Sequence, residues 1–187
     1  MVVQLSRKLF TVDQYNKILD AGVFTENERV ELIRGEIVKM SPMGIHHSAC
    51  VKCLAELFIL RLAQTVTVGI QDSVRLNNTS EPQPDISLLQ RRPDFYRTQQ
   101  PQPENVFLLI EVSDTTIKYD REVKVPLYAE NNIVEVWLVN LNEKCLEVYR
   151  QPKGNGYENM QTFKKGETMT IQVFPNVTFT VDEILGD

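Results

Sequence analysis

The chain has 187 residues, of which 42% are hydrophobic and 24% charged, a composition that excludes a disordered chain and predicts a single folded domain over residues 1–187. Its formal net charge of −5 argues against a protein that binds nucleic acid through an overall basic surface, although an acidic nuclease with a local basic face stays compatible. The sequence has no secretion signal and no apolar run long enough to cross a bilayer, and three cysteines favour reduced thiols. We therefore expect a cytoplasmic protein with no membrane contact.

Hydrophobic spacing predicts the elements of the N-terminal half. The first is a short helix that begins at Thr11 and ends near Gly22. A hairpin that turns at Arg34-Gly35 follows. The next elements are a long amphipathic helix and then two strands, at residues 46–64, 65–76 and 84–90.

The C-terminal half is predicted to be richer in strands. Residues 91–105 contain several prolines and charges and indicate an exposed loop, whereas residues 106–113 form the most apolar run and indicate a central strand. A helix over residues 120–131 should be kinked or shortened by Pro126. Five more strands are expected at residues 133–140, 145–151, 157–166, 168–174 and 177–181. The pattern predicts an α/β fold, a mixed central sheet flanked by helices with a β-rich C-terminal third.

Two carboxylates lie in or beside these apolar strands. Asp85 precedes one strand and Glu111 lies within another, and two nearby carboxylates repel each other unless a cation joins them. Mg²⁺ or Mn²⁺ would satisfy both, because these ions prefer oxygen ligands. The main-chain carbonyl of Val112 and the carboxylate of Glu31 are further oxygen donors. Lys124, on the following helix, could supply an ammonium that orients water and offsets negative charge on a phosphate.

The motifs "QPDISLL" and "LLIEVSDTTIKYDREVKVPLYAENNIVEVWLVN", with the earlier "ELIRGEIVKMSPMGIHH", resemble the PD-(D/E)XK phosphodiesterase superfamily and its restriction-endonuclease-like fold. More closely, they resemble a family of uncharacterised restriction-endonuclease-like proteins, over about residues 10–181. The resemblance implies a metal-dependent DNA endonuclease in which Asp85, Glu111 and Glu31 match the acidic positions. The usual lysine two places after Glu111 is replaced by Ser113, and Lys124 is its expected substitute.

Each of these residues also has an ordinary structural interpretation. Asp85 could be an exposed residue at the start of a strand, Glu111 could pair with Lys118 or Arg121, and Lys124 could be solvated. The fold could then be an inactive module that binds nucleic acid or protein. A homodimer is a further hypothesis, because nucleases that cut both strands often dimerise.

Two other groups of residues were considered as sites. His46, His47, Cys50 and Cys53 have ligand types that zinc prefers, but their helical spacing favours core packing, and the resemblance places His47 at the rim of an active site. The loop that contains Arg91, Arg92, Phe95, Tyr96 and Arg97 is a candidate nucleic-acid contact.

The acidic cluster also predicts how charge affects stability. If three carboxylates share only Lys124, at least one of them should have a raised pKa. We expect Asp85→Asn to relieve this repulsion, so that the metal-free protein is as stable as the wild type or more so.

Overall fold

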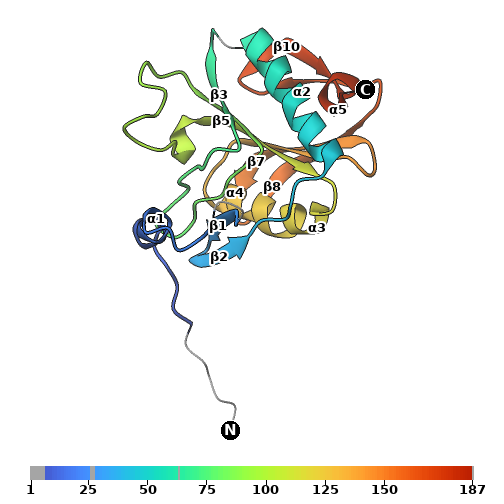
Figure 1. The fold of residues 1–187 in the computed structure, drawn as a ribbon. Helices are drawn as coiled ribbons and strands as arrows, with labels where there is room; N and C mark the ends of the chain where they lie inside the picture. Colours follow the sequence, from blue (N-terminus) through green and yellow to red (C-terminus); the bar gives the residue numbers. More distant parts are fainter. Residues whose placement is uncertain (1–6, 26–27, 63, 187) are drawn as a thin grey trace.

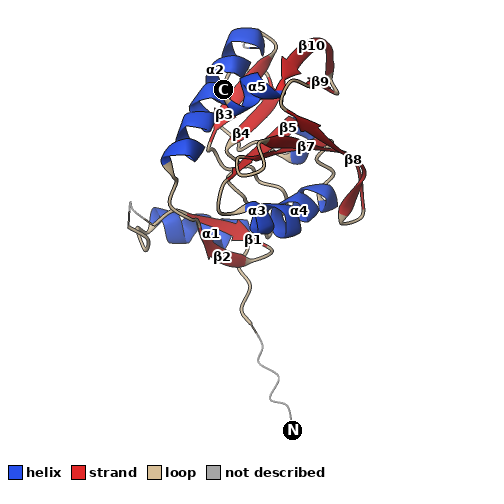
Figure 2. Ribbon diagram, turned by 90° about the vertical axis from the view of Figure 1, so that its right-hand side faces the viewer, coloured by secondary structure: helices blue, strands red, loops and turns tan. Residues whose placement is uncertain are grey.

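The computed structural model describes residues 7–25, 28–62 and 64–186, and a six-stranded sheet lies at its centre (Figures 1 and 2). The strands follow the order β3-β4-β5-β6-β7-β8, and only β5 and β6 run parallel. Their bounds are β3 Val66–Ile70, β4 Ile86–Gln90, β5 Val106–Ser113, β6 Glu135–Asn140, β7 Cys145–Lys153 and β8 Gly156–Lys164. The predicted mixed sheet with helices around it is confirmed.

Helices cover both faces of this sheet (Figure 2). On one face, α2 (Ile45–Leu62) and α5 (Val181–Leu185) pack over a core in which the Phe58 ring lies 5.3 Å from that of Phe179. On the other face, α4 (Val125–Glu130) packs over a second core. Leu108, Ile110 and Val112 of β5 enter the first core and Val106 and Leu109 the second, which explains why both faces of the strand are apolar.

The helical segment after β5 differs from its prediction. It begins at α3 (Ile117–Tyr119), continues through a π-helical turn, η2 (Asp120–Lys124), and ends as α4. The N–H of Val125 bonds to the carbonyl of Asp120, five residues back. Pro126 follows this wider turn and the helix continues to Glu130, so the proline does not end the helix.

The N-terminal hairpin was predicted correctly but lies outside the main sheet. β1 (Val30–Ile33) and β2 (Glu36–Lys39) form their own two-stranded sheet, and the turn residues Arg34 and Gly35 both have positive φ, 49° and 82°. Leu32 exchanges main-chain hydrogen bonds with Glu81 at 3.3 and 2.8 Å. Helix α1 (Val12–Asp20), capped by Thr11 as expected, packs against the hairpin.

Three boundaries differ from the sequence-based expectation. The strand predicted over residues 65–76 ends at Ile70, because Gln71 adopts a positive φ of 55°. Helix α2 ends at Leu62, and residue 63 of the predicted helix lies outside the described residues. The last two strands, β9 (Thr168–Ile171) and β10 (Phe174–Thr180), form a separate hairpin that leads into α5, a helix that was not predicted.

The loop over residues 91–105 contains one short 3₁₀ turn, η1 (Pro103–Asn105). Within the described ranges, none of the helices is long and apolar enough to cross a membrane.

Candidate active site

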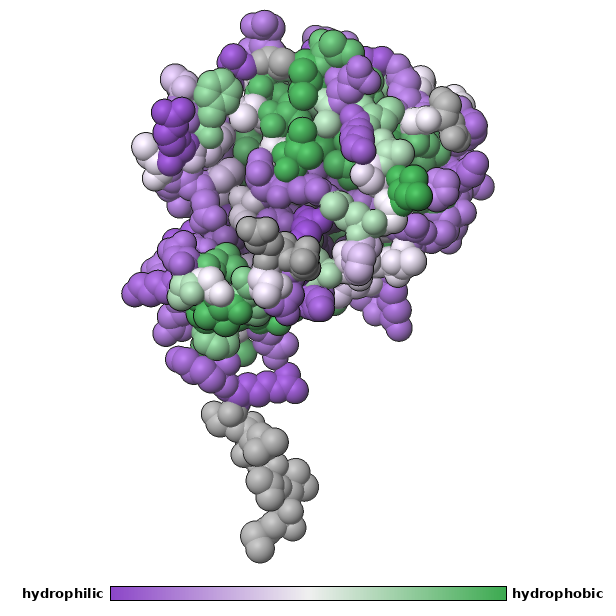
Figure 3. Space-filling model, viewed as in Figure 1, coloured by the Kyte–Doolittle hydropathy of each residue, from purple (hydrophilic) through white to green (hydrophobic). Residues whose placement is uncertain are grey.

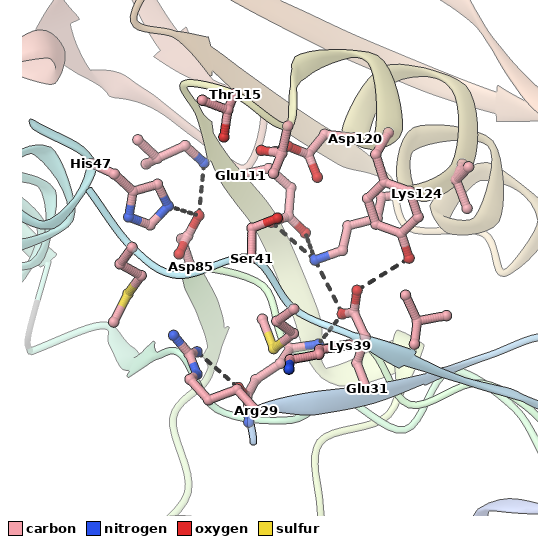
Figure 4. A pocket seen from close by; sticks show the side chains of 18 of the residues that line it. Arg29, Glu31, Lys39, Ser41, His47, Asp85, Glu111, Thr115, Asp120 and Lys124 are labelled. Carbon is pink, nitrogen blue, oxygen red and sulfur yellow. Dashed lines mark hydrogen bonds and ion pairs between the residues drawn. The ribbon is translucent and has the colours of Figure 1, made fainter. Parts of the chain in front are cut away.

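The predicted site residues line one pocket of about 590 Å³ (Figure 4). Glu31 comes from β1, Asp85 from the residue before β4, Glu111 and Val112 from β5, and Lys124 from η2. The end of β4 explains part of this convergence. Ile86 pairs with Ile110, so beyond Ile110 that side of β5 has no strand partner. There the Asp85 carboxylate accepts the Val112 N–H at 2.9 Å.

Lys124 lies between two carboxylates at the base of the pocket. Its Nζ is 3.2 Å from Glu31 Oε2 and 3.2 Å from Glu111 Oε1, and all three residues are at most 3% exposed. Burial lowers the pKa of Lys124, but the carboxylates of Glu111 and Glu31 raise it more, so the ammonium keeps its proton. The two ordinary interpretations are therefore wrong: Lys124 is not solvated, and Glu111 does not pair with Lys118 or Arg121. Arg121 pairs instead with Glu147 at 2.5 Å.

Asp85 has a different environment from Glu111. It is 8% exposed, so it is not an exposed strand-start residue. Its carboxylate also accepts from Gln71 Nε2 at 3.0 Å and lies 3.0 Å from His47 Nε2. Burial alone would raise the pKa of Asp85. Its hydrogen bonds to His47, Gln71 and Val112 lower the pKa by more than burial raises it, so the pKa lies below the ordinary value.

Glu111, unlike Asp85, has a pKa above its ordinary value. Burial raises the pKa of Glu111 well above its ordinary value, in spite of Lys124. This direction agrees with the expectation of one carboxyl with a raised pKa, and repulsion from Asp85 contributes to it, although the pKa of Asp85 itself is lowered. Because Asp85 is stabilised as an anion, its replacement by Asn should not stabilise the metal-free protein.

Sequence reasoning missed Asp120 and Tyr128. Asp120 is buried at 4% exposure and accepts from the hydroxyls of Ser113 and Thr116 at 2.6 and 2.7 Å. The Tyr128 hydroxyl donates to Glu111. Asp120, Lys124 and Tyr128 recur every four residues, a spacing that puts them on one helical face and that could have revealed them.

Glu31 has protein partners at both oxygens. Oε2 accepts the N–H of Gln83 at 3.2 Å in addition to pairing with Lys124, and Oε1 accepts the hydroxyl of Tyr119 at 3.2 Å. The carboxylate thus fixes Lys124 from the side of the N-terminal hairpin.

The donor chemistry fits a hard divalent cation. Asp85 and Glu111 supply carboxylates. The carbonyl of Ser113 accepts from Leu141, on the β6 side, so strand alternation directs the preceding Val112 carbonyl toward Asp85. In the described part of the chain, however, no three His, Cys, Asp or Glu side chains are grouped so as to hold a metal as they stand. The ammonium of Lys124 already pairs with both Glu31 and Glu111 in this arrangement.

The other candidate groups have structural partners. Cys50 and Cys53 donate to the carbonyls of Ile184 and Glu183, both at 3.3 Å, and so join α2 to α5. Cys50 is buried, whereas Cys53 is only half-buried, and His47 faces Asp85 instead of the thiols.

In the loop after β4, Arg92 pairs with Asp94 at 2.9 Å and lies 4.8 Å from the centre of the Tyr96 ring. These contacts are within the loop, so the loop supports no particular ligand.

Comparison with known proteins adds a family and a fold. The family model Uma2, described as "Putative restriction endonuclease", matches residues 12–182. A similar solved structure is that of "a putative nuclease belonging to DUF820" from Anabaena variabilis ATCC 29413, which is 14% identical, has a TM-score of 0.71 and aligns over 95% of this chain and 98% of that one. No curated protein matches the chain. The structural likeness confirms the expected restriction-endonuclease-like fold.

Proposed function

Because this chain belongs to the Uma2 family, we propose that it is a divalent-metal-dependent phosphodiesterase that hydrolyses the backbone of DNA. Family membership supports a nuclease, and the single observation that carries the finer proposal is the convergence of Asp85, Glu111 and Lys124 in one pocket. A carboxylate pair beside a buried ammonium is a costly arrangement for a protein that has no anionic substrate to bind.

Asp85, Glu111 and the carbonyl of Val112 would hold Mg²⁺ or Mn²⁺. When bound, such an ion polarises the scissile phosphate and lowers the pKa of a coordinated water. Lys124 keeps its proton, so Nζ acts as a fixed positive charge that orients water and offsets negative charge on the phosphate, and not as a base. Glu31, predicted as a further metal ligand, is assigned to holding Lys124, because both of its oxygens already have protein partners.

The test is cleavage of plasmid DNA and of labelled oligonucleotides in Mg²⁺, in Mn²⁺ and in a chelator. Metal-dependent cleavage should be lost in Asp85→Asn, Glu111→Gln and Lys124→Met. Asp94→Asn is a matched control, because it removes a hydrogen-bonded aspartate in a loop outside the pocket. Cleavage that survives Asp85→Asn would contradict the assignment.

A second function, an inactive module that binds nucleic acid or protein, is favoured by one specific observation. Glu31 and Glu111 already pair with Lys124, and Asp85 with His47, so all three carboxylates have protein partners. Salt-dependent DNA binding without cleavage in either metal would support this alternative.

Two expectations accompany the enzyme proposal. We propose a cytoplasmic location, consistent with three free thiols, and a homodimer as the form that would cut both strands, which sedimentation can test.

A further inference from the structure

The mouth of the pocket differs in charge from its floor. Glu31, Asp85, Glu111 and Lys124 are at most 8% exposed and form the floor. Three cations surround the mouth. Arg29, just before β1, is half-buried. Lys39 at the end of β2 and Lys118 in α3 are exposed. Figure 4 shows Arg29 and Lys39 together on the hairpin side of the pocket, away from Lys124.

These cations are available to a ligand. Gln83 orients Arg29, whose Nη2 donates to Gln83 Oε1 at 2.9 Å. Among the residues described, neither Lys39 nor Lys118 forms a salt bridge, although Lys39 is close enough to the exposed carboxylate of Glu28 to lower its pKa. One exposed carboxylate, Glu122, shares the mouth, so the rim as a whole is positive. Figure 3 shows a band of hydrophilic residues across the middle of the molecule.

A positive rim above an acidic floor complements a polyanion. One phosphodiester can enter while neighbouring phosphates stay outside, where Arg29, Lys39 and Lys118 can contact them. This arrangement explains how an acidic protein could bind nucleic acid locally.

The lining also contains apolar groups. Val38, Met40, Met43 and Val123 face the same pocket. In a duplex the bases are stacked inside and meet protein only at their edges, whereas bases of a single strand can contact apolar side chains with their faces. A volume of about 590 Å³ is typical of a site for one small ligand and is sufficient for a single nucleotide.

We propose that Arg29, Lys39 and Lys118 bind the backbone of a single-stranded segment of nucleic acid, one nucleotide of which enters the pocket beside Met40 and Met43. Its phosphodiester then reaches Asp85 and Glu111. This inference rests on the proposed function and specifies its substrate class: single strands, overhangs or flaps instead of intact duplex.

The experiment is fluorescence anisotropy of a labelled DNA strand and its blunt duplex over a series of salt concentrations. The full-length Asp85→Asn protein is used so that no cleavage occurs, and the wild type in a chelator repeats the measurement without a substitution. The single strand should bind about tenfold or more tightly than the duplex.

Replacing the three rim cations together (R29Q, K39Q and K118Q) should reduce the slope of log affinity against log salt by about 2, because each contact with single-stranded phosphate contributes about 0.7. Glu122→Gln should strengthen binding. A control with the same loss of charge, K153Q, K164Q and K165Q, removes exposed lysines outside the pocket and should leave the slope nearly unchanged.

Equal affinity for strand and duplex would overturn the inference, as would the same slope in the rim variant and in its parent. If duplex DNA is cleaved and the rim variant binds DNA with the same salt slope as its parent, this inference is overturned but the proposed enzyme is not. Rim-dependent strand binding without cleavage would overturn the proposed enzyme but keep the inference. An RNA strand of the same sequence identifies which nucleic acid is preferred.

Discussion

Lys124→Met should destabilise the metal-free protein strongly. The substitution keeps the length of the side chain but leaves Glu31 and Glu111 buried, close together and without their common cation. Removing one partner of a buried ion pair costs about 3–5 kcal/mol. In a chain of this size each kcal/mol lowers the melting temperature by about 2–4 °C, so we expect a decrease of about 6–20 °C.

Thermal and urea unfolding in a chelator measure this effect, and three further samples test its cause. Lys118→Met removes an exposed lysine and should change the free energy of unfolding by less than about 0.5 kcal/mol. Adding Glu111→Gln to Lys124→Met removes one unpaired charge and should restore part of the stability. Mn²⁺ should stabilise Lys124→Met more than the wild type, because a cation can replace the lost ammonium. A melting temperature within a degree or two of the wild type would refute the reasoning.

Three other predictions concern Asp85, the metal and Cys50. Asp85→Asn should lower the free energy of unfolding in urea by about 1–3 kcal/mol without metal, since Asn has one acceptor oxygen where Asp85 has two, and its NH2 group would face either Gln71 Nε2 or the Val112 N–H; unchanged stability would contradict this. Excess Mg²⁺ or Mn²⁺ should raise the melting temperature of the wild type but not of Asp85→Asn, and equal shifts would exclude Asp85 as a ligand. Burial raises the pKa of Cys50 from about 9 to about 12, so the folded thiol should react slowly with disulfide reagents. Only the unfolded thiol ionises between those pH values, so this group should lower the stability by on the order of 4 kcal/mol as pH rises from 9 to 12. Buried tyrosines such as Tyr15 and Tyr128 also lower the stability in this range, so Cys50→Ala should show a smaller loss than the wild type, by the share of Cys50.

Most of the secondary structure could be predicted because local patterns determine it. The apolar run of β5 and the Arg34-Gly35 turn each carry their own signal. The end of β3 carried no signal, since the positive φ of Gln71 depends on its tertiary setting. Helix α5 was missed although Thr180 and Glu183 form a capping box, because its apolar residues also fit a strand.

Four side chains of the candidate site could be predicted, but Asp120, Tyr128 and the pairing of the charges could not. Carboxylates in apolar strands point to Asp85 and Glu111, and the resemblance points to Glu31 and Lys124. Nothing in the sequence indicates that Glu31, 93 positions before Lys124, binds it from a separate hairpin, or that His47 and Gln71 stabilise the Asp85 anion. These partners are distant in sequence, and their charges can be assigned only from the folded arrangement.

The π-helical turn at Asp120–Lys124 makes the pocket sensitive to the length of the chain. The turn holds one residue more than an α-helical turn would, and successive helical residues are rotated by about 100°. Suppose that a single residue were lost here, even the exposed Glu122. With Asp120 held in place, Lys124 and Tyr128 would rotate about the helix axis and lose their contacts with Glu111, although every site side chain would still be present. Homologous chains should therefore tolerate substitutions in this turn more readily than deletions. A relative with an alignment gap in this turn would need a cationic residue from another element in the place of Lys124.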